Sequence, residues 1–420
     1  MIFPLRHGPQ TSFRIGDAMK PNLLARLFGG RAAVPEAKAS RAGPLIALQG
    51  HGRPVWTSRD LASLAREGFM KNAIVYRAVT MIAEAAASVP LLAYEGEAER
   101  PDHPLLALLA HPNARQSGAA WFEALYGNWL VSGNAYAELV KLGGLPAELH
   151  ALRPDRMKVV AGPDGWPEAY EYSVAGRSVR FPVEDGQSPI LHLRTYHPLD
   201  DHYGFAPLEA AAVALDLHNA AGAWNKALLD NAARPSGALV YRGEGGANLS
   251  QDQFERLKRE LEANYTGAVN AGRPLLLEGG LDWTSMALTP RDMDFMEAKH
   301  GAAREIALAF GVPPMLLGIP GDNTYANYAE ANRVFWRQTV LPLVGRTAEA
   351  LAAWLAPHYP GGGLRLGFDT DAVEALSVER AALWSRVGAA DFLTRDEKRQ
   401  AVGYGVEGRA LEEGEEGWTT

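Results

Sequence analysis

The sequence contains no cysteine among its 420 residues. A disulfide framework and a thiolate metal site are therefore excluded, and a cytoplasmic setting is the simplest expectation. Long apolar runs are absent as well, since a segment such as Pro104–Ala110 is far shorter than the roughly 18 residues that a membrane-spanning helix needs. The first residues also lack the apolar core of a secretory signal peptide. We therefore expect no association with a membrane.

The signature motifs of several enzyme classes are missing too. The chain has no G-x-x-x-x-G-K-[ST] phosphate loop, which excludes an ATPase of that class. It has neither the H-E-x-x-H pair of zinc hydrolases nor the G-x-S-x-G turn that carries a nucleophilic serine. We expect a protein that is not an enzyme and that needs no cofactor.

One polar cluster, residues 192–202, is the strongest candidate for a metal site. Two histidines and a carboxylate can hold a divalent metal ion, so a metal-dependent hydrolase built on His192, His197 and Asp200 is one interpretation. The other is a hydrated turn, because Pro198 and Gly204 are turn residues and metal ligands are usually held on rigid elements. We favour the turn and expect no metal, and the hydrolase remains the alternative.

The net charge of the chain is negative and is unevenly distributed along the sequence. A tight nucleic-acid binder usually carries a basic surface, whereas this chain has a net charge of -8. Residues 1–60 carry a net +6 and residues 365–420 a net -5. We interpret these ends as a solvated arm and an acidic tail rather than as recognition elements. Met19 opens a more natural amino terminus than Met1, which suggests that translation starts there.

The first half of the chain mixes helix and strand patterns. The spacing of Ile74, Ala78 and Ile82 predicts a helix over residues 73–88, ending before Pro90. Aromatic and aliphatic residues at every fourth position predict a second helix over residues 119–130. From residue 135 to about 193, Val-, Tyr- and Phe-rich segments separated by glycine turns predict strands.

Long helices dominate the second half. Pro207 is a favourable first helical residue, and residues 208–233 contain no proline. Ser250 and Gln253 form a capping box. Gly311, followed by two prolines, is a helix stop. The predicted elements are helices 208–233, 251–264, 289–310 and 325–354 (kinked near Pro342), strands 237–241, 273–278 and 281–288, and short helices after Ser377 and Thr394.

Four segments, in this order, resemble the portal proteins of long-tailed phages. The third is similar to that family's E-I-A-x-A-F-x-V-P-P-x-L-L-G and is the most specific. The fourth has Asp391 and Asp396 where the family commonly has Gly and Asn. The segments are His197–Leu215, Asn231–Gly237, Glu305–Gly318 and Asp391–Arg399. The composition also resembles the portals of bacterial gene transfer agents.

The resemblance implies an α+β portal fold that assembles as a homo-oligomeric ring, usually a dodecamer, at one capsid vertex. Double-stranded DNA would pass through the ring during packaging and ejection. Its partners would be the large terminase, then the head–tail adaptor, and the major capsid protein. The protein would be assembled in the bacterial cytoplasm and reside in a virion or phage-like particle. A monomeric scaffold or adaptor protein is a further alternative.

The resemblance also divides the chain into regions. These would be an arm (1–60), the wing (61–206), a first stem helix (207–233), the clip (234–289), a second stem helix (290–311), a tunnel loop with a kinked helix and a returning wing strand (312–374), the crown (375–408) and the acidic tail (409–420).

Two groups of residues would then carry the function. The tunnel loop, Gly318–Tyr328, would face DNA, although a simple cap of the next helix is the other interpretation of this stretch. The clip would dock terminase or adaptor. Small residues of the first stem helix would let neighbouring subunits approach, or would serve packing within the chain. The DNA-facing candidates are Asn323, Thr324, Tyr325, Asn327 and Tyr328, and the docking candidates are Arg242, Glu244, Gln253, Arg256, Lys258 and Arg259.

Overall fold

The computed structural model describes residues 56–230, 237–241, 250–265, 281–285, 291–321, 325–360 and 362–407. They belong to one unit, Val55–Thr420, and the separate unit Met1–Pro54 lies outside the described residues. The predictions for the arm, for Met19, for strand 273–278 and for the acidic tail from residue 409 therefore concern residues outside this description.

Helices begin where side chains replace missing backbone partners. In α2 (Ala73–Ala87) the Asn72 side chain accepts hydrogen bonds from the N–H groups of Ile74 and Val75. Ser117 caps α4 (Gly118–Ser132), which ends at Gly133 in a left-handed conformation. These two helices confirm the predictions for 73–88 and 119–130. Before α2 and α4 lie α1 (Leu61–Leu64), a π-helical turn (Ala65–Met70) and α3 (Pro104–Ala110).

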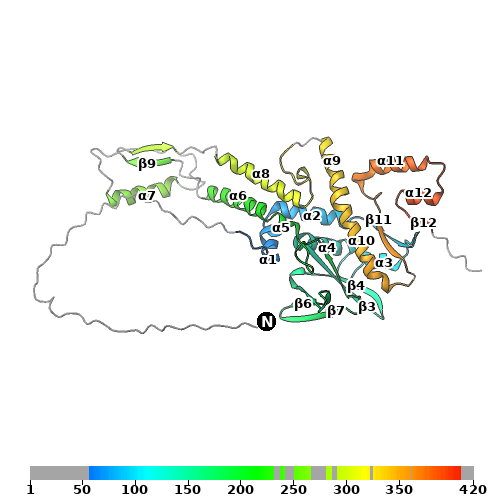
Figure 1. Cartoon of the computed structure of the whole chain (residues 1–420). Coiled ribbons are helices and arrows are strands. Elements are labelled where there is room, and N and C mark those ends of the chain that lie inside the picture. Colours follow the sequence, from blue (N-terminus) through cyan, green and yellow to red (C-terminus); the bar gives the residue numbers. More distant parts are fainter. Residues whose placement is uncertain are drawn as a thin grey trace, which may run out of the picture. The chain divides into compact units, whose positions relative to one another are not determined.

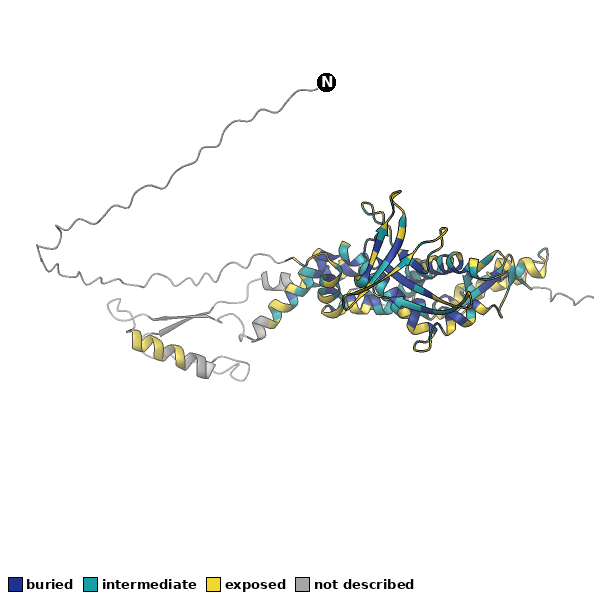
Figure 2. Ribbon diagram, turned by 90° about the horizontal axis from the view of Figure 1, so that it is seen from below, coloured by how far each residue is buried: buried dark blue, intermediate teal, exposed yellow. Residues whose placement is uncertain are grey.

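The largest core lies between α2, α4 and α10 (Leu341–Leu355). Trp121 and Leu125 of α4 and Ile82 of α2 are fully buried, as is Leu351 of α10. The buried face predicted for α2 was placed slightly off, because Val75 and Val79 are buried and Ile74 is only half-buried. In Figure 2 the buried residues concentrate in these central helices and the strands beside them.

Three sheets confirm the predicted strand-rich region and extend it. β3 (Asn134–Leu142) is the centre of the order β4-β3-β8, and all of its pairings are antiparallel. A second sheet has the order β5-β6-β7. The third joins distant segments in the order β11-β1-β2-β12; its strands β11 and β12 are labelled in Figure 1. The strands are β1 (Leu91–Glu95), β2 (Ala98–Glu99), β4 (Leu145–Leu152), β5 (Met157–Ala161), β6 (Pro167–Val174), β7 (Arg177–Pro182), β8 (Ile190–Arg194), β11 (Leu364–Phe368) and β12 (Val406–Glu407).

The helix predicted over 208–233 is divided in two. α5 (Pro207–Ala210) ends at Ala211, whose ψ of 7° leaves the helical region, and α6 (Ala212–Asp230) follows. The prediction of one unbroken helix was therefore wrong. At the start of α5 the Ala206 N–H donates to the Glu209 carboxylate at 3.2 Å, which caps the amino-terminal end of this short helix.

The segment between α6 and α8 (Arg291–Ala309) confirms two strands and a helix. β9 (Gly237–Tyr241) pairs antiparallel with β10 (Leu281–Ser285), which matches the first five residues of the predicted strand 281–288. Helix α7 (Gln251–Tyr265) begins at the predicted capping box: Gln253 N–H donates to Ser250 Oγ at 3.3 Å, and Ser250 N–H donates to Gln253 Oε1 at 3.0 Å.

The last predicted helices are also present. α9 (Tyr325–Phe335) runs through a π-helical stretch (Trp336–Val340) into α10, and Pro342 in the first turn of α10 accounts for the predicted interruption because it donates no N–H. α11 (Ser377–Gly388) and α12 (Arg395–Ala401) follow. Short 3₁₀ turns occupy Pro154–Arg156, Pro314–Leu317, Ala356–His358 and Glu374–Leu376. Among the described residues, no helix combines the length and the apolar character that a bilayer crossing requires.

Candidate functional site

The two helices expected to form a stem, α6 and α8, pack side by side and antiparallel (Figure 1). Leu215 near the start of α6 and Ile306 near the end of α8 are both fully buried in the main core. Further along, Asn225 Nδ2 lies 3.8 Å from Met296 Sδ, so the later part of α6 meets the early part of α8. The two helices form an antiparallel pair whose buried contacts lie at the Leu215 and Ile306 end.

The small residues in and just before α6 divide into two groups. Ala211, Ala212 and Ala221 are buried within the chain, so ordinary intramolecular packing explains them. Ala220 and Ala223 are exposed. Only the second group is available to a neighbouring molecule.

After α8 the chain makes two turns, each at a glycine with positive φ. Gly311 has φ +67°, and the following Val312 N–H donates to the Ala307 carbonyl at 2.9 Å. Gly318 has φ +71°, and Ile319 N–H donates to the Pro314 carbonyl at 3.2 Å. Both pairs follow the glycine-ended cap in which a later N–H satisfies a helix carbonyl. These turns lead the chain back along α8.

The beginning of the expected tunnel loop is therefore fixed to α8. Ile319 is buried against Ala303 and Ala307, with Ile74 of α2 packed at the same place. The Arg304 guanidinium donates to the Pro320 carbonyl, and a side chain at Gly321 would collide with that guanidinium. Sequence reasoning missed this anchor, because Arg304 and Pro320 are 16 residues apart and no local pattern pairs them.

The five DNA-facing candidates are only partly described. Asn323 and Thr324 lie outside the described residues. Tyr325 is the first residue of α9, so the loop ends at residue 324. Asn327 and Tyr328 lie on the first turn of α9 and are exposed. The structure thus presents two of the candidates on a helix beside the anchored loop.

The docking candidates are likewise divided. Arg242 and Glu244 lie outside the described residues. Arg256, Lys258 and Arg259 are exposed on α7, and Gln253 is exposed as well but also serves the capping box. α7 therefore presents three basic side chains within four positions.

The polar cluster of residues 192–202 serves packing and a turn. The His192 ring stacks on Tyr136, with 4.3 Å between ring centroids, and its Nε2–H donates to Asn134 Oδ1 at 3.0 Å. Burial lowers the pKa of His192 to about 3, so it stays neutral. Asp200 accepts the N–H groups of His202 and Tyr203 at 2.8 and 2.9 Å.

His197, the third proposed ligand of the hydrolase, has a different role. Its Nδ1 accepts the Leu199 N–H at 3.0 Å, and its ring meets Phe205 edge-on. Nowhere in the described parts of the chain do three side chains of metal-ligating type gather. The hydrolase interpretation gains no support from this arrangement.

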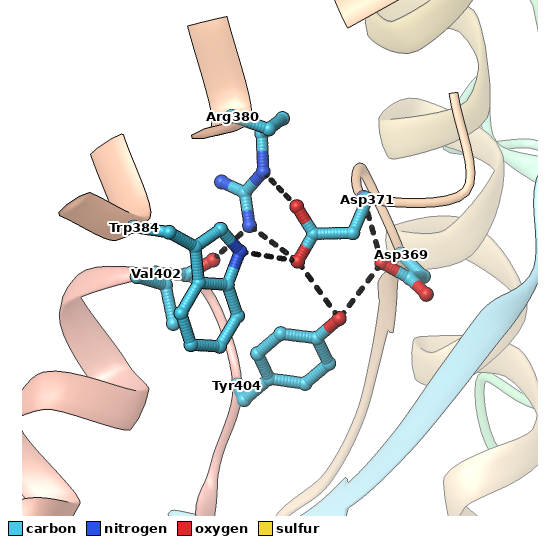
Figure 3. A network of polar contacts seen from close by, with 6 residues as sticks. All are labelled: Asp369, Asp371, Arg380, Trp384, Val402 and Tyr404. Atoms are coloured by element: carbon cyan, nitrogen blue, oxygen red, sulfur yellow. Dashed lines mark hydrogen bonds and ion pairs between the residues drawn. The ribbon is translucent and has the colours of Figure 1, made fainter. Parts of the chain in front are cut away.

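A polar network near the carboxyl end was not predicted from the sequence (Figure 3). Asp371 accepts two hydrogen bonds from Arg380, at 2.5 and 2.9 Å, and one from Trp384 Nε1 at 3.0 Å. The Tyr404 hydroxyl lies 3.0 Å from Asp371 and 3.1 Å from Asp369. The Arg380 bonds, followed by those of Trp384 and Tyr404, lower the pKa of Asp371 to about 2.

The same segment is tied to the third sheet. Arg399 of α12 donates to Glu99 of β2 at 2.8 Å and to the Gly405 carbonyl at 2.7 Å. Tyr94 of β1 donates to the Gly403 carbonyl at 3.2 Å. β12 then pairs in parallel with β2. We call residues 374–407 the C-terminal unit; polar contacts of this kind attach it to the rest of the fold.

Comparison with known proteins gives a consistent result. A family model described as "Phage portal protein" matches residues 73–403. A protein of Rickettsia bellii is 42% identical over 342 residues, covering 80% of this chain and 88% of that one. The portal protein of Enterobacteria phage HK97 is 25% identical over 398 residues, covering 92% and 89%. A chain in the neck of a native gene transfer agent particle, computed with C12 symmetry, is 57% identical, covers 84% of this chain and 96% of its own, and superposes with a TM-score of 0.67.

Proposed function

This chain belongs to the phage portal protein family, and from that premise we propose that twelve copies form a ring at one vertex of a virion or gene transfer agent particle. A portal subunit is a structural component, and family membership gives no reason to expect catalysis. The observation that carries the proposal is the 57% identity to a chain of a particle neck with C12 symmetry.

We further propose the division of the chain into wing, stem, clip and crown. The antiparallel pair α6 and α8 would be the stem, and the segment with β9, α7 and β10 between them the clip. The C-terminal unit would be the crown. The order of these elements along the chain supports the assignment, since the clip candidate is inserted exactly between the two stem candidates.

In this proposal the loop before α9 faces double-stranded DNA. Its position is supported by the anchor at Ile319 and Arg304, which holds the loop at the end of the stem. Asn323, Thr324, Asn327 and Tyr328 are uncharged, so they would contact phosphates weakly and would not retain the DNA. The exposed basic residues of α7 would dock the large terminase and later the head–tail adaptor. The major capsid protein would surround the ring.

Ring assembly is the first test. The purified chain, concentrated and incubated with its adaptor or terminase, should give rings with a central hole in negative-stain images. A strictly monomeric particle under those conditions would instead support a scaffold or adaptor protein.

The second test concerns the loop. We expect Asn323→Lys, Thr324→Lys to lower the amount of DNA packaged per particle severalfold, because added cations bind phosphates and slow translocation. The matched control is Glu184→Gln, Gln187→Lys, which adds the same charge in an exposed turn between β7 and β8. Equal packaging by the two variants would show that the loop does not line the path of the DNA.

A further inference from the structure

The inward-facing side of α6 changes character along the helix. Leu215 is fully buried in the apolar core. His218 and Asn219 lie on the same side, three and four positions later, but their contacts are polar. Both meet the side chain of Asn72, the residue that caps α2 and that is only 2% exposed. At this point α6 is attached to the start of α2 by hydrogen bonds.

The bonds of Asn72 fix the orientation of its amide group. Its Oδ1 accepts the N–H groups of Ile74 and Val75 at 3.0 and 3.2 Å. A backbone N–H can only donate, so the amide atom that points toward α6 is the nitrogen. This Nδ2 donates to Asn219 Oδ1 at 2.9 Å and lies 3.0 Å from His218 Nδ1. Each of its two hydrogens therefore has one acceptor on α6.

The protonation state of His218 follows from this geometry. Asn219 is oriented by a backbone group as well, because its Nδ2 donates to the Glu67 carbonyl at 2.9 Å. With both amides fixed, His218 Nδ1 accepts the bond from Asn72, so this nitrogen carries no proton and the ring hydrogen is on Nε2. A second proton would set an N–H of the ring against an N–H of Asn72.

The surroundings of the ring also oppose a second proton. Burial, followed by the charges of Lys299 and His300 on α8, lowers the pKa of His218. Among the described residues, no carboxylate is hydrogen-bonded to this histidine. The ring therefore has no acidic partner that would stabilise its charged form.

The acidic groups nearby are bonded to other residues. Glu67 pairs with Lys71. Asp216 accepts the N–H and the hydroxyl of Thr57. The charged residues that line an open cleft together with His218 are Glu67, Lys71, Asp216, Lys226 and Lys299.

We propose that the bond between Asn72 and His218 is an acid-sensitive attachment of α6: one proton taken up at His218 Nδ1 breaks it and releases α6 from the start of α2. Because only the neutral ring can accept the bond, the attached state takes up this proton less readily than the detached state. The attachment is fully present above about pH 6.5, the ordinary histidine pKa, and is lost as the pH falls from there through the lower pKa of the attached state. All of these contacts lie within one chain, so the inference does not depend on the proposed ring.

The pKa of His218 is the first measurement. Deuterium exchange at the imidazole C2 carbon, followed by mass spectrometry of the full chain, reports each histidine separately. We expect a value below about 6.5 for His218 in the wild type. A value at or above that of an unfolded chain would overturn the proposal.

Asn72→Asp gives the sharpest variant. Aspartate still caps α2, because it accepts the same two N–H groups, but it places a carboxylate oxygen where the amide N–H faces His218. We expect the pKa of His218 to rise above about 6.5, reversing the pH dependence, because a protonated ring can donate to that oxygen. His358, in the 3₁₀ turn Ala356–His358, is the internal control and should not change. If the pKa of His218 stayed unchanged or fell, Asn72 would not be its partner.

The attachment itself is measured by the protection factors of the α6 amides in the full chain. In the wild type these should fall by up to about tenfold per pH unit below about pH 6.5, the limit for uptake of one proton. His218→Asn offers an oxygen acceptor that does not titrate, so its α6 protection should stay constant over the same range. His218→Ala lacks the acceptor and should show low, constant protection. The α4 amides are the control for the rest of the fold.

The outcomes separate this inference from the proposed function. A fall in wild-type α6 protection that His218→Asn abolishes supports the attachment. Constant protection in the wild type, or the same fall in His218→Asn, overturns it, whether or not the chain forms rings. Failure of the concentrated chain to form rings bears on the proposed function alone.

Discussion

The helical core and the C-terminal unit are held by different forces. Around α2, α4 and α10, large side chains such as Trp121, Leu125 and Leu351 are completely removed from water. In the C-terminal unit, buried apolar side chains are few, chiefly Leu376, Val387 and Val402. There the contacts are hydrogen bonds and ion pairs centred on Asp371 and Arg399.

Because of this difference, we expect the helical core and the C-terminal unit to unfold in different ways. Apolar burial is non-directional and is shared among many neighbours, so the core unfolds as a whole. A polar network depends on a few directed bonds, so a single substitution can release the C-terminal unit while the core remains folded.

The largest effect is expected in the core. Trp121→Ala should lower the free energy of unfolding by about 3–5 kcal/mol, because it leaves a cavity between α4 and α2. Denaturant unfolding followed by circular dichroism measures this change. Trp166→Ala, at an exposed hairpin tip, is the control and should stay within about 0.5 kcal/mol. Similar losses for both tryptophans would contradict the contrast between core and surface.

A smaller and more local effect is expected at Asp371. Asp371→Asn removes the charge that pairs with Arg380, and should cost about 2 kcal/mol, confined to the C-terminal unit. Hydrogen exchange should speed up by roughly tenfold or more in α11 and α12, and remain unchanged in α2. The exposed Asp391→Asn, in the turn before α12, is the matched control. Faster exchange in α2 as well would show that the two regions are not independent.

Lowering the pH should have the same effect on the C-terminal unit as the Asp371→Asn substitution. The pKa of Asp371 is lowered to about 2 in the folded chain, chiefly by its bonds to Arg380, so its contribution is fully present above about pH 4 and is lost as the pH falls through 2. Tyr404 remains protonated, since burial and the neighbouring carboxylates raise its pKa. The protection factors of the α11 amides, which are exchange rates corrected for the intrinsic effect of pH, should therefore fall between pH 4 and pH 2 in the wild type, and should fall less in Asp371→Asn.

Local sequence signals predicted the fold where the cause is local. The capping boxes at Ser250 and Thr394 and the stop at Gly311 all lie where their patterns indicated. The break at Ala211 was missed, since alanine is a strong helix former and the surrounding sequence contains no helix-breaking residue. The strand-rich region and the long helices were predicted for the same reason, as strand and helix periodicities are local properties. The α+β portal fold itself was expected from the family resemblance.

Contacts between residues far apart in the sequence could not be predicted from local sequence patterns. β12 pairs with β2 across some 300 residues, and no pattern in either short strand specifies the other. The Asp371 network and the anchor of Ile319 on α8 are of the same kind. The candidate site was therefore located by family resemblance, and only the structure revealed that its loop is fixed to α8.

The smallest effect is expected at the start of α12, inside the C-terminal unit. Thr394 Oγ accepts the Glu397 N–H at 3.3 Å, while the Glu397 carboxylate accepts the Thr394 N–H at 2.8 Å. Thr394→Ala should cost about 1 kcal/mol, because the freed N–H must find water instead. Exchange should rise only in α12, and Thr394→Ser should restore protection because serine supplies the same hydroxyl. If Thr394→Ala released α11 as well, α12 would be part of the Asp371 attachment rather than a separately capped helix, and the C-terminal unit would be as cooperative as the core.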